Sequence, residues 1–216
     1  MSFSPLPKTL IADLARPGSG PVVDLGCGDG RFGDRLREHH PAGIYGLDRS
    51  RGPHVRAAAI ADVDRPPLRD GGCGLLVAAN LLRHLPHPAA AVAAWRRALR
   101  PDGVLWILED EPAAAAGPGG LYRDLQGWLV RHGPPGRGAL LPQRRARELL
   151  DDGPGWRWGG FVNQEALRDP AALLAGLRAA AAGGDAAAAV LADRLERESF
   201  AYGEAWWARW QQEAVA

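Results

Sequence analysis

The stretch VVDLGCGDG, residues 22–30, is a short apolar strand that runs directly into a turn with glycine at positions 26, 28 and 30. Glycine has no Cβ, so such a turn can approach a ligand closely, and a helix that begins at Arg31 offers free N–H groups to an anion. The stretch therefore predicts a cofactor-binding turn. A dinucleotide fingerprint would need glycine where Arg31 stands, which argues against NAD. A glycine turn without a ligand remains the alternative.

Strands and helices alternate around this turn. Apolar segments predict strands, and helical spacing with turn residues predicts helices. The expected strands are 21–25, 44–48, 57–62, 75–79 and 104–108, and the expected helices are 5–15, 31–38 and 89–99. This alternation predicts an α/β fold with a doubly wound, Rossmann-like, mostly parallel sheet that binds ligands at the carboxyl ends of its strands.

The second half of the chain has a looser pattern. The expected elements are helices at 120–132 and 142–151, a strand at 156–163, and helices at 170–182 and 185–212 with a break at Gly183-Gly184. No seventh strand is evident, so either the sheet has an incomplete C-terminal edge or a short edge strand escapes detection. We expect one domain over 1–216, with a cofactor core at 15–110 and a substrate-side part with a helical extension at 111–216.

Composition excludes several classes of protein. The formal charge is +1, from 26 basic and 25 acidic residues, so no strong field attracts nucleic acid or an anionic membrane. Residues 1–10 do not resemble a signal peptide, and the alanine-rich stretch 171–192 is too polar to span a bilayer. Two cysteines without metal-ligand spacing fit a reducing compartment and predict no metal site. We expect a soluble, cytoplasmic protein.

An acidic residue follows the second expected strand. Asp48 stands 24 residues after Asp24, where a carboxylate could accept hydrogen bonds from both hydroxyls of a ribose. Taken alone, Asp48 could equally cap a helix. Its position after the glycine turn favours the ribose interpretation.

In this order and spacing, the chain resembles the class I S-adenosylmethionine (SAM)-dependent methyltransferases over about residues 15–110, and more narrowly the small-molecule, type 11-like group. The resemblance implies SAM as cofactor and assigns roles to matching positions. Asp62 and Val63 resemble the adenine-contacting segment, although Asp62 also suits a loop or cap. The residues implied in cofactor binding are Asp24, Gly26, Cys27, Gly28, Gly30, Asp48, Asp62, Val63 and Asn80.

The segment after the fourth strand supplies a candidate catalytic residue. Where the family usually has two histidines, this chain has Arg83-His84. An imidazole titrates near neutrality, so His84 is the candidate general base, and the alternative is that it positions the segment or caps a helix. Asn80 is followed by Leu81 and Leu82, so the motif of exocyclic-amine methyltransferases is missing and methylation of DNA base amines is disfavoured.

One departure from the family lies between the second and third strands. Only eight residues, 49–56, stand where the family has a full crossover helix. We expect one side of the adenine pocket to be open.

Aromatic residues are concentrated in the second half of the chain. They are Tyr122, Trp128, Trp156, Trp158, Tyr202, Trp206, Trp207 and Trp210. They could line a pocket for a hydrophobic or aromatic acceptor, but the spacing of the last three suits packing on the core or on a second subunit equally well. If these tryptophans pack on a second subunit, we expect a homodimer formed through a tryptophan-rich C-terminal helix.

The leading hypothesis is methyl transfer from SAM to a small metabolite, with 111–135 and 185–212 as a lid. Methylation of RNA or protein is an alternative, supported by the arginines at 144, 145 and 147. The other alternative is a protein that binds SAM and regulates or scaffolds a partner without catalysing methyl transfer.

Overall fold

A computed structural model describes residues 14, 20–37, 40, 43–50, 58–113, 119–133, 137–151, 153–163, 170–198, 200 and 203–212. The helix expected at 5–15 lies outside these residues except for Leu14. Most of the short 49–56 connection lies outside them as well, so the expected opening beside the adenine pocket stays a prediction.

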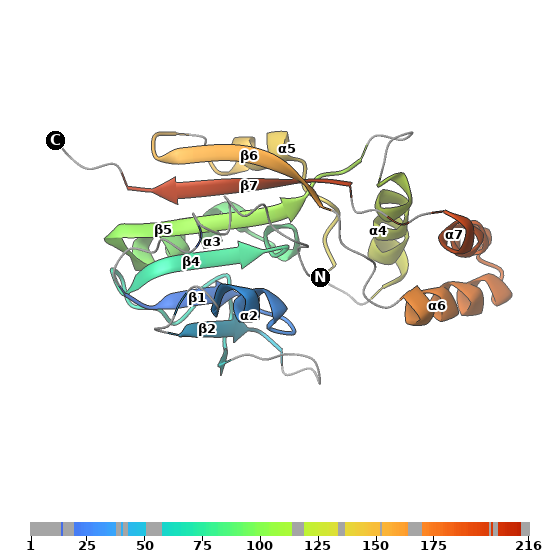
Figure 1. The fold of residues 1–216 in the computed structure, drawn as a ribbon, viewed down its shortest axis with the longest axis horizontal. Coiled ribbons are helices and arrows are strands. Elements are labelled where there is room, and N and C mark those ends of the chain that lie inside the picture. The colour runs from blue at the N-terminus through green and yellow to red at the C-terminus, as the bar shows by residue number, and fades with distance from the viewer. Residues whose placement is uncertain are drawn as a thin grey trace.

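Seven strands of the described chain form one sheet in the order β3-β2-β1-β4-β5-β7-β6 (Figure 1). The strands are β1 (Val22–Leu25), β2 (Ile44–Asp48), β3 (Ala59–Ile60), β4 (Cys73–Ala79), β5 (Leu99–Asp110), β6 (Trp156–Asn163) and β7 (Gly203–Gln211). Neighbouring strands from β3 to β5 are parallel, and β7 is antiparallel to both β5 and β6. The predicted α/β, mostly parallel fold is confirmed.

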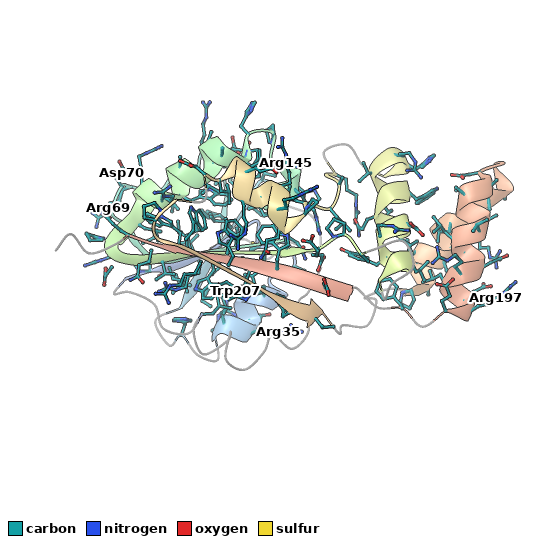
Figure 2. The ribbon with its side chains drawn as sticks, turned by 90° about the horizontal axis from the view of Figure 1, so that it is seen from above. Arg35, Arg69, Asp70, Arg145, Arg197 and Trp207 are labelled. Carbon is teal, nitrogen blue, oxygen red and sulfur yellow. The ribbon has the colours of Figure 1, made fainter. Side chains whose placement is uncertain are left out.

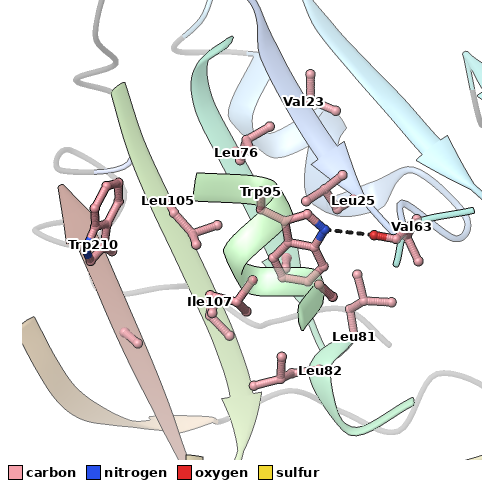
Figure 3. Packing of buried hydrophobic residues seen from close by; sticks show 14 of the residues in the cluster. Val23, Leu25, Val63, Leu76, Leu81, Leu82, Trp95, Leu105, Ile107 and Trp210 are labelled. Atoms are coloured by element: carbon pink, nitrogen blue, oxygen red, sulfur yellow. Dashed lines mark hydrogen bonds between the residues drawn. The ribbon is translucent and has the colours of Figure 1, made fainter. Parts of the chain in front are cut away.

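Helices cover both faces of the sheet. On one face, α2 (Arg31–Arg37) packs with Leu14 against β1, β4 and β5. On the other face, α3 (Pro88–Ala98) and α5 (Gln143–Leu149) pack against the same strands. Trp95 of α3 is completely buried in this core (Figure 3). The apolar strand β4 lies between these two cores because both of its faces are apolar.

The predicted helix at 185–212 is wrong in its second half. It ends as α7 (Ala186–Arg197), and residues 203–211 form the strand β7, so the sheet has the seventh strand that the sequence did not reveal. Trp206, Ala208 and Trp210 face the core on the α3 side, while Trp207 packs on the opposite face. The alternation of a strand, with period two, thus explains the tryptophans better than helical spacing does.

A glycine opposite β7 explains why a tryptophan fits inside the sheet. Gly159 of β6 pairs with Trp207, and a Cβ on Gly159 would lie only 2.5 Å from the indole ring. The ring of Trp207 lies 5.2 Å from that of Trp106 in β5. Because Gly159 has no side chain, the indole of Trp207 fits against β6. Neither segment alone predicts this contact.

Three helices form a separate group beyond the carboxyl ends of the parallel strands (Figure 1). They are α4 (Gly120–His132), α6 (Pro170–Ala182) and α7, and they share a hydrophobic cluster that includes Leu125, Leu177 and Leu191. The predicted break at Gly183-Gly184 is confirmed: Asp185 caps α7 by accepting a hydrogen bond from the Ala188 N–H at 3.0 Å. Because β7 lies inside the sheet, residues 203–211 cannot belong to a lid.

Other boundaries also differ from those expected. The strand expected at 57–62 is only the exposed pair 59–60. Strand β5 begins at Leu99, before the strand expected at 104–108, and its pairing with β4 shifts register between Cys73 and Leu75. Figure 2 shows the side chains over the whole described chain.

Candidate functional site

A cavity of about 640 Å³ opens at the carboxyl ends of β1, β2 and β4. Six of the ten predicted site residues line it: Gly26, Asp48, Asp62, Val63, Asn80 and His84. The other four, Asp24, Cys27, Gly28 and Gly30, lie in the turn or beneath it. The topology therefore brings together residues from separate strands at the place where a parallel sheet binds ligands.

The glycine turn folds onto the end of β2. Gly26, Gly28 and Gly30 have φ angles of +66°, +50° and +78°, which favour glycine. The N–H groups of Gly26 and Cys27 both donate to the Leu47 carbonyl, at 2.8 and 3.1 Å. The turn is thus held in a shape that a residue with a side chain would strain.

We expect Gly26→Ala to lower the free energy of unfolding by about 1–3 kcal/mol, because the new Cβ would require a positive φ and would lie 2.7 Å from Leu81 Cδ1. Urea denaturation measures the change. Gly176→Ala is the matched control: it lies in α6 with nothing within 4 Å of the added Cβ, so it should be neutral or stabilising. Equal stability of Gly26→Ala and wild type would contradict the strained geometry.

The carboxylate of Asp48 connects the turn to the cavity. Its Oδ2 accepts a hydrogen bond from the Gly28 N–H at 3.0 Å, and its Oδ1 accepts from the Ser50 N–H and Oγ at 3.0 and 3.1 Å. Each carboxylate oxygen has two lone pairs, so Oδ2 can still accept a ribose hydroxyl. The contacts with Ser50 form a local turn, and the residues of a helix that Asp48 could cap, 51–57, lie outside the described residues.

The side chain of Asp24 lies beneath the turn and does not line the cavity. Burial, and then the negative charge of Asp48, raise the pKa of Asp24 to about 7, while the Gly33 N–H in α2 acts in the opposite direction. Burial, followed by the charges of Asp24 and Asp48, also raises the pKa of the Cys27 thiol to about 12. Cys27 therefore stays a neutral thiol and is unsuited to nucleophilic chemistry.

The loop after β3 is anchored from the core. The Val63 carbonyl accepts a hydrogen bond at 2.8 Å from Nε1 of Trp95 (Figure 3). Asp62 is exposed, and its Oδ1 accepts from the Asp64 N–H at 3.0 Å, as in the loop interpretation. The predicted adenine-contacting pair thus faces the cavity from a fixed backbone.

Asn80 offers an acceptor to the cavity. Its φ is +52°, and its N–H donates to the Leu108 carbonyl at 2.7 Å, which fixes the residue at the end of β4. Its buried Oδ1 has no hydrogen-bond partner among the described residues. A buried amide oxygen needs a donor, and SAM carries N–H donors at its ammonium and adenine ends, so the site fits that cofactor.

The sequence matches a known family at this site. Residues 23–107 fit the model of a methyltransferase-domain family, and this span holds the glycine turn, Asp48, Asp62 and Asn80. Residues 23–107 therefore form a methyltransferase domain, similar to those of the class I SAM-dependent methyltransferases. SAM is the cofactor of this family.

Relatives of the methyltransferase domain agree on the fold. A methyltransferase from an antibiotic biosynthesis pathway of Anabaena variabilis superposes with a TM-score of 0.61 at 18% identity, over 93% of this chain and 94% of that one. Phosphoethanolamine N-methyltransferase 2 of Haemonchus contortus, solved with phosphomonomethylethanolamine and S-adenosylhomocysteine, gives 0.57 at 11% identity over 95% and 52% of the chains.

One curated relative is an uncharacterised 37.1 kDa protein of the transposon Tn4556 of Streptomyces fradiae. It is 35% identical over 119 residues, which are 48% of this chain and 34% of the relative. The match thus spans about a third of that protein's length.

His84 lies on the wall of the methyltransferase cavity, but its ring is engaged. The Gly138 N–H donates to His84 Nδ1 at 3.0 Å. The Arg83 Nε–H points at Nε2 over a longer 3.4 Å, and a neutral ring can accept at only one of its two nitrogens, so the shorter contact favours Nδ1 as the acceptor. The lone pair that a general base needs is therefore used to hold the segment after residue 136, and this geometry favours the positioning role over the role of base.

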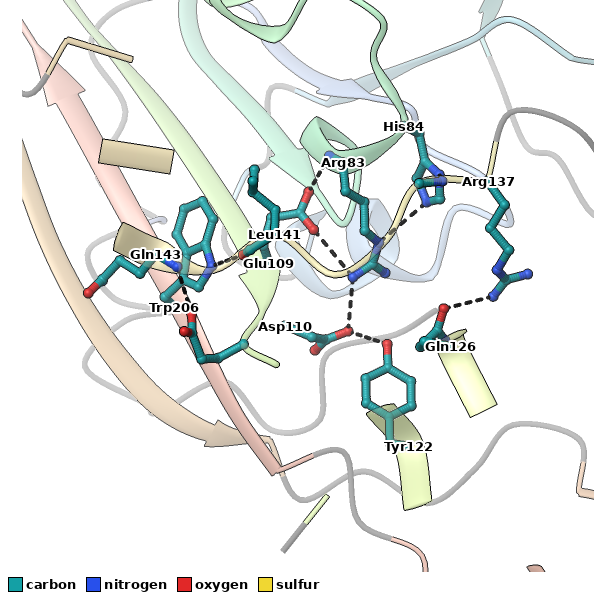
Figure 4. A network of polar contacts seen from close by, with 12 residues as sticks. Arg83, His84, Glu109, Asp110, Tyr122, Gln126, Arg137, Leu141, Gln143 and Trp206 are labelled. Carbon is teal, nitrogen blue, oxygen red and sulfur yellow. Dashed lines mark hydrogen bonds and ion pairs between the residues drawn. The ribbon is translucent and has the colours of Figure 1, made fainter. Parts of the chain in front are cut away.

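A buried charged network, not predicted from the sequence, lies behind His84 (Figure 4). Arg83 Nη1 lies 3.3 Å from Glu109 Oε2 and 3.6 Å from Asp110 Oδ2, and Tyr122 donates to Asp110 Oδ2 at 2.7 Å. Burial raises the pKa of Glu109 to about 7, against the opposing effect of Arg83. Burial alone would lower the pKa of Arg83, but Glu109, Tyr122 and Asp110 together raise it. The sequence feature that could have indicated this network is the acidic run 109–111 at the end of an apolar strand.

The segment 137–143 reaches the cavity through Arg137 and contacts distant parts of the chain. Gly138 packs so closely on the chain that a Cβ would overlap the Arg83 carbonyl oxygen. The Leu141 carbonyl accepts from Trp206 Nε1 at 2.8 Å, and the Gln143 N–H donates to Glu111 Oε2 at 2.7 Å. The sequence of this segment did not predict its position, because its contacts all join residues far apart in the chain.

Two kinds of feature are missing from the described residues. No group of three or more His, Cys, Asp or Glu side chains there could hold a metal ion. None of the described helices is both long and apolar enough to cross a membrane.

Proposed function

We propose that this protein transfers a methyl group from SAM to a small-molecule acceptor in the cavity at the carboxyl ends of β1, β2 and β4. The observation that carries the proposal is the position of Asp48. Its carboxylate holds the glycine turn through Gly28 and at the same time lines the cavity beside Asn80. In the family, this is the place of the ribose-binding acid.

The residues of the chain would act mainly by positioning. The bound cofactor supplies an electrophilic methyl group on a sulfonium, so the protein must align a nucleophile with that group and exclude water. Leu81, Leu85 and Pro86 give the cavity an apolar surface that suits a small organic acceptor. We propose that His84 fixes the segment 137–143 through Gly138 and acts as base only if that hydrogen bond opens.

Asp48→Ala tests the cofactor site. We expect the variant to bind SAM and S-adenosylhomocysteine about tenfold to a hundredfold more weakly in isothermal titration, because it removes charge-assisted hydrogen bonds to the ribose and the support of the turn. Asp102→Ala, an exposed carboxylate near Arg100, is the matched control and should bind like wild type. Unchanged affinity in a folded Asp48→Ala variant would refute the ribose assignment.

Methylation of RNA or protein is a weaker proposal. Two of the three arginines of α5 that supported it are engaged: Arg145 bonds Glu148 at 2.7 Å, and the guanidinium of Arg147 lies 4.8 Å from the ring centre of Trp158. Transfer of label from methyl-labelled SAM to metabolites, RNA or protein distinguishes the acceptors. A protein that binds SAM and labels none of them would be the non-catalytic regulator or scaffold.

The proposals on cellular location and on dimer formation depend on the cysteines and the tryptophans, respectively. Both cysteines are free and buried, which supports a reducing, cytoplasmic location. The expected dimer lacks its basis, because Trp206, Trp207 and Trp210 lie in strand β7 and not in a helix, and Trp206 and Trp210 are buried.

A further inference from the structure

One arginine on the cavity wall lacks a compensating charge. Arg137 lines the cavity at the acceptor side, next to His84 (Figure 4). Its Nη2 donates to Gln126 Oε1 in α4 at 3.4 Å, which is a long hydrogen bond, and its buried Nε has no partner. In the part of the chain that the structure describes, no carboxylate lies within ion-pair distance of this guanidinium.

The environment of Arg137 disfavours its positive charge. Burial, and then the positive charge of Arg83, lower the pKa of Arg137, although an arginine stays protonated in practice. A partly buried cation without a counter-ion is costly, and a bound anion would remove that cost.

The other arginines near the cavity have acidic neighbours. Arg83 is neutralised by Glu109 and Asp110. Arg49, the other arginine on the wall, is exposed, and its charge acts on Asp64 at the cofactor side. Arg137 is thus the uncompensated cation of the described cavity wall.

The backbone of Arg137 is also held in place. The next residue, Gly138, packs on the Arg83 carbonyl and donates its N–H to His84. A guanidinium on a fixed backbone is pre-organised, so less conformational entropy is lost when it binds a planar carboxylate with two hydrogen bonds.

We propose that Arg137 binds a carboxylate of the methyl acceptor, so that the substrate class is a small organic monocarboxylate with an apolar body. This inference rests on the proposed function. One guanidinium compensates one negative charge, which favours a carboxylate over a doubly charged phosphate. The apolar lining from Leu85 and Pro86 suits the remainder of such a molecule.

Fractionation of acceptors tests the proposal. An ultrafiltered metabolite extract of the source organism is separated at pH 8 into an anionic fraction, retained on an anion exchanger, and a flow-through. Each fraction is incubated with methyl-labelled SAM and with wild type, Arg137→Gln or Arg145→Gln. Arg145 is the matched control, because it is an exposed arginine of α5 (Figure 2). Titration of all three proteins with S-adenosylhomocysteine reports the cofactor site separately.

We expect labelled product from the anionic fraction, a loss of about tenfold or more with Arg137→Gln, and wild-type activity with Arg145→Gln. S-adenosylhomocysteine should bind all three proteins with equal affinity. Product from the flow-through alone, or full activity of Arg137→Gln, would overturn the inference and leave the proposed function intact. A tenfold weaker affinity of Arg137→Gln for S-adenosylhomocysteine would also overturn it, because the arginine would then hold the cofactor's own carboxylate. No product from either fraction with wild type would contradict the proposed function itself.

Discussion

Arg83→Leu is expected to destabilise the protein by about 3–5 kcal/mol at pH 8, because the buried Glu109 must then either stay charged without its partner or take up a proton well above its ordinary pKa. Both side chains are fully buried, with Arg83 Nη1 3.3 Å from Glu109 Oε2, so solvent cannot replace the lost interaction. Urea denaturation at fixed pH measures the change. Arg100→Leu, which removes a half-exposed arginine paired with Asp102, should change stability by less than about 0.5 kcal/mol.

The same variant should depend on pH in a definite direction. The folded pKa of Glu109 is raised to about 7 from 4.5, so its contribution to stability is complete below about pH 4.5 and is lost as the pH rises through 7. Without Arg83 this pKa rises further, since Arg83 favours the charged form. The destabilisation should therefore be smaller at pH 5 than at pH 8, and adding Glu109→Gln to Arg83→Leu should restore part of the loss at pH 8. Equal losses at both pH values would contradict the assignment.

Trp95→Ala is the second change with a large expected effect. We expect it to cost about 3–5 kcal/mol, because it empties the centre of the core under β1, β4 and β5 (Figure 3). It also removes the 2.8 Å hydrogen bond to the Val63 carbonyl, so the loop that carries Asp62 should loosen and S-adenosylhomocysteine should bind more weakly.

Two variants separate these effects. Trp95→Phe keeps most of the volume but not the hydrogen bond, so its loss should be smaller, about 1–3 kcal/mol. Val190→Ala, at a valine that is 59% exposed on α7, should change little. A loss below about 1 kcal/mol for Trp95→Ala would mean that the indole does not fill the core as described.

The cofactor half was predictable because its signals are local. A glycine turn needs particular residues in consecutive positions, and Asp48 and Asn80 follow apolar strands whose carboxyl ends meet in any parallel sheet of this kind. Helices such as 120–132 and 170–182 were predicted with their observed bounds, since their periodicity and their terminal glycines lie within the segments themselves.

The acceptor half was not predictable in this way. Strand β7 was taken for a helix, because Trp206 and Trp210 are four residues apart and the space for Trp207 is provided by Gly159, more than forty positions away. The pairing of Arg83 with Glu109 and the contact of Gly138 with His84 likewise join distant segments.

The sequence by itself thus determined the α/β sheet, the glycine turn and the acids expected around SAM, because short-range sterics and hydrophobic periodicity specify them. Only the tertiary structure decided that His84 is held by a backbone N–H, that β7 completes the sheet, and that Arg137 faces the cavity with no counter-ion among the described residues. The reason is physical: hydrogen bonds, ion pairs and burial between segments far apart in the chain depend on where folding places them, and no local pattern encodes that position.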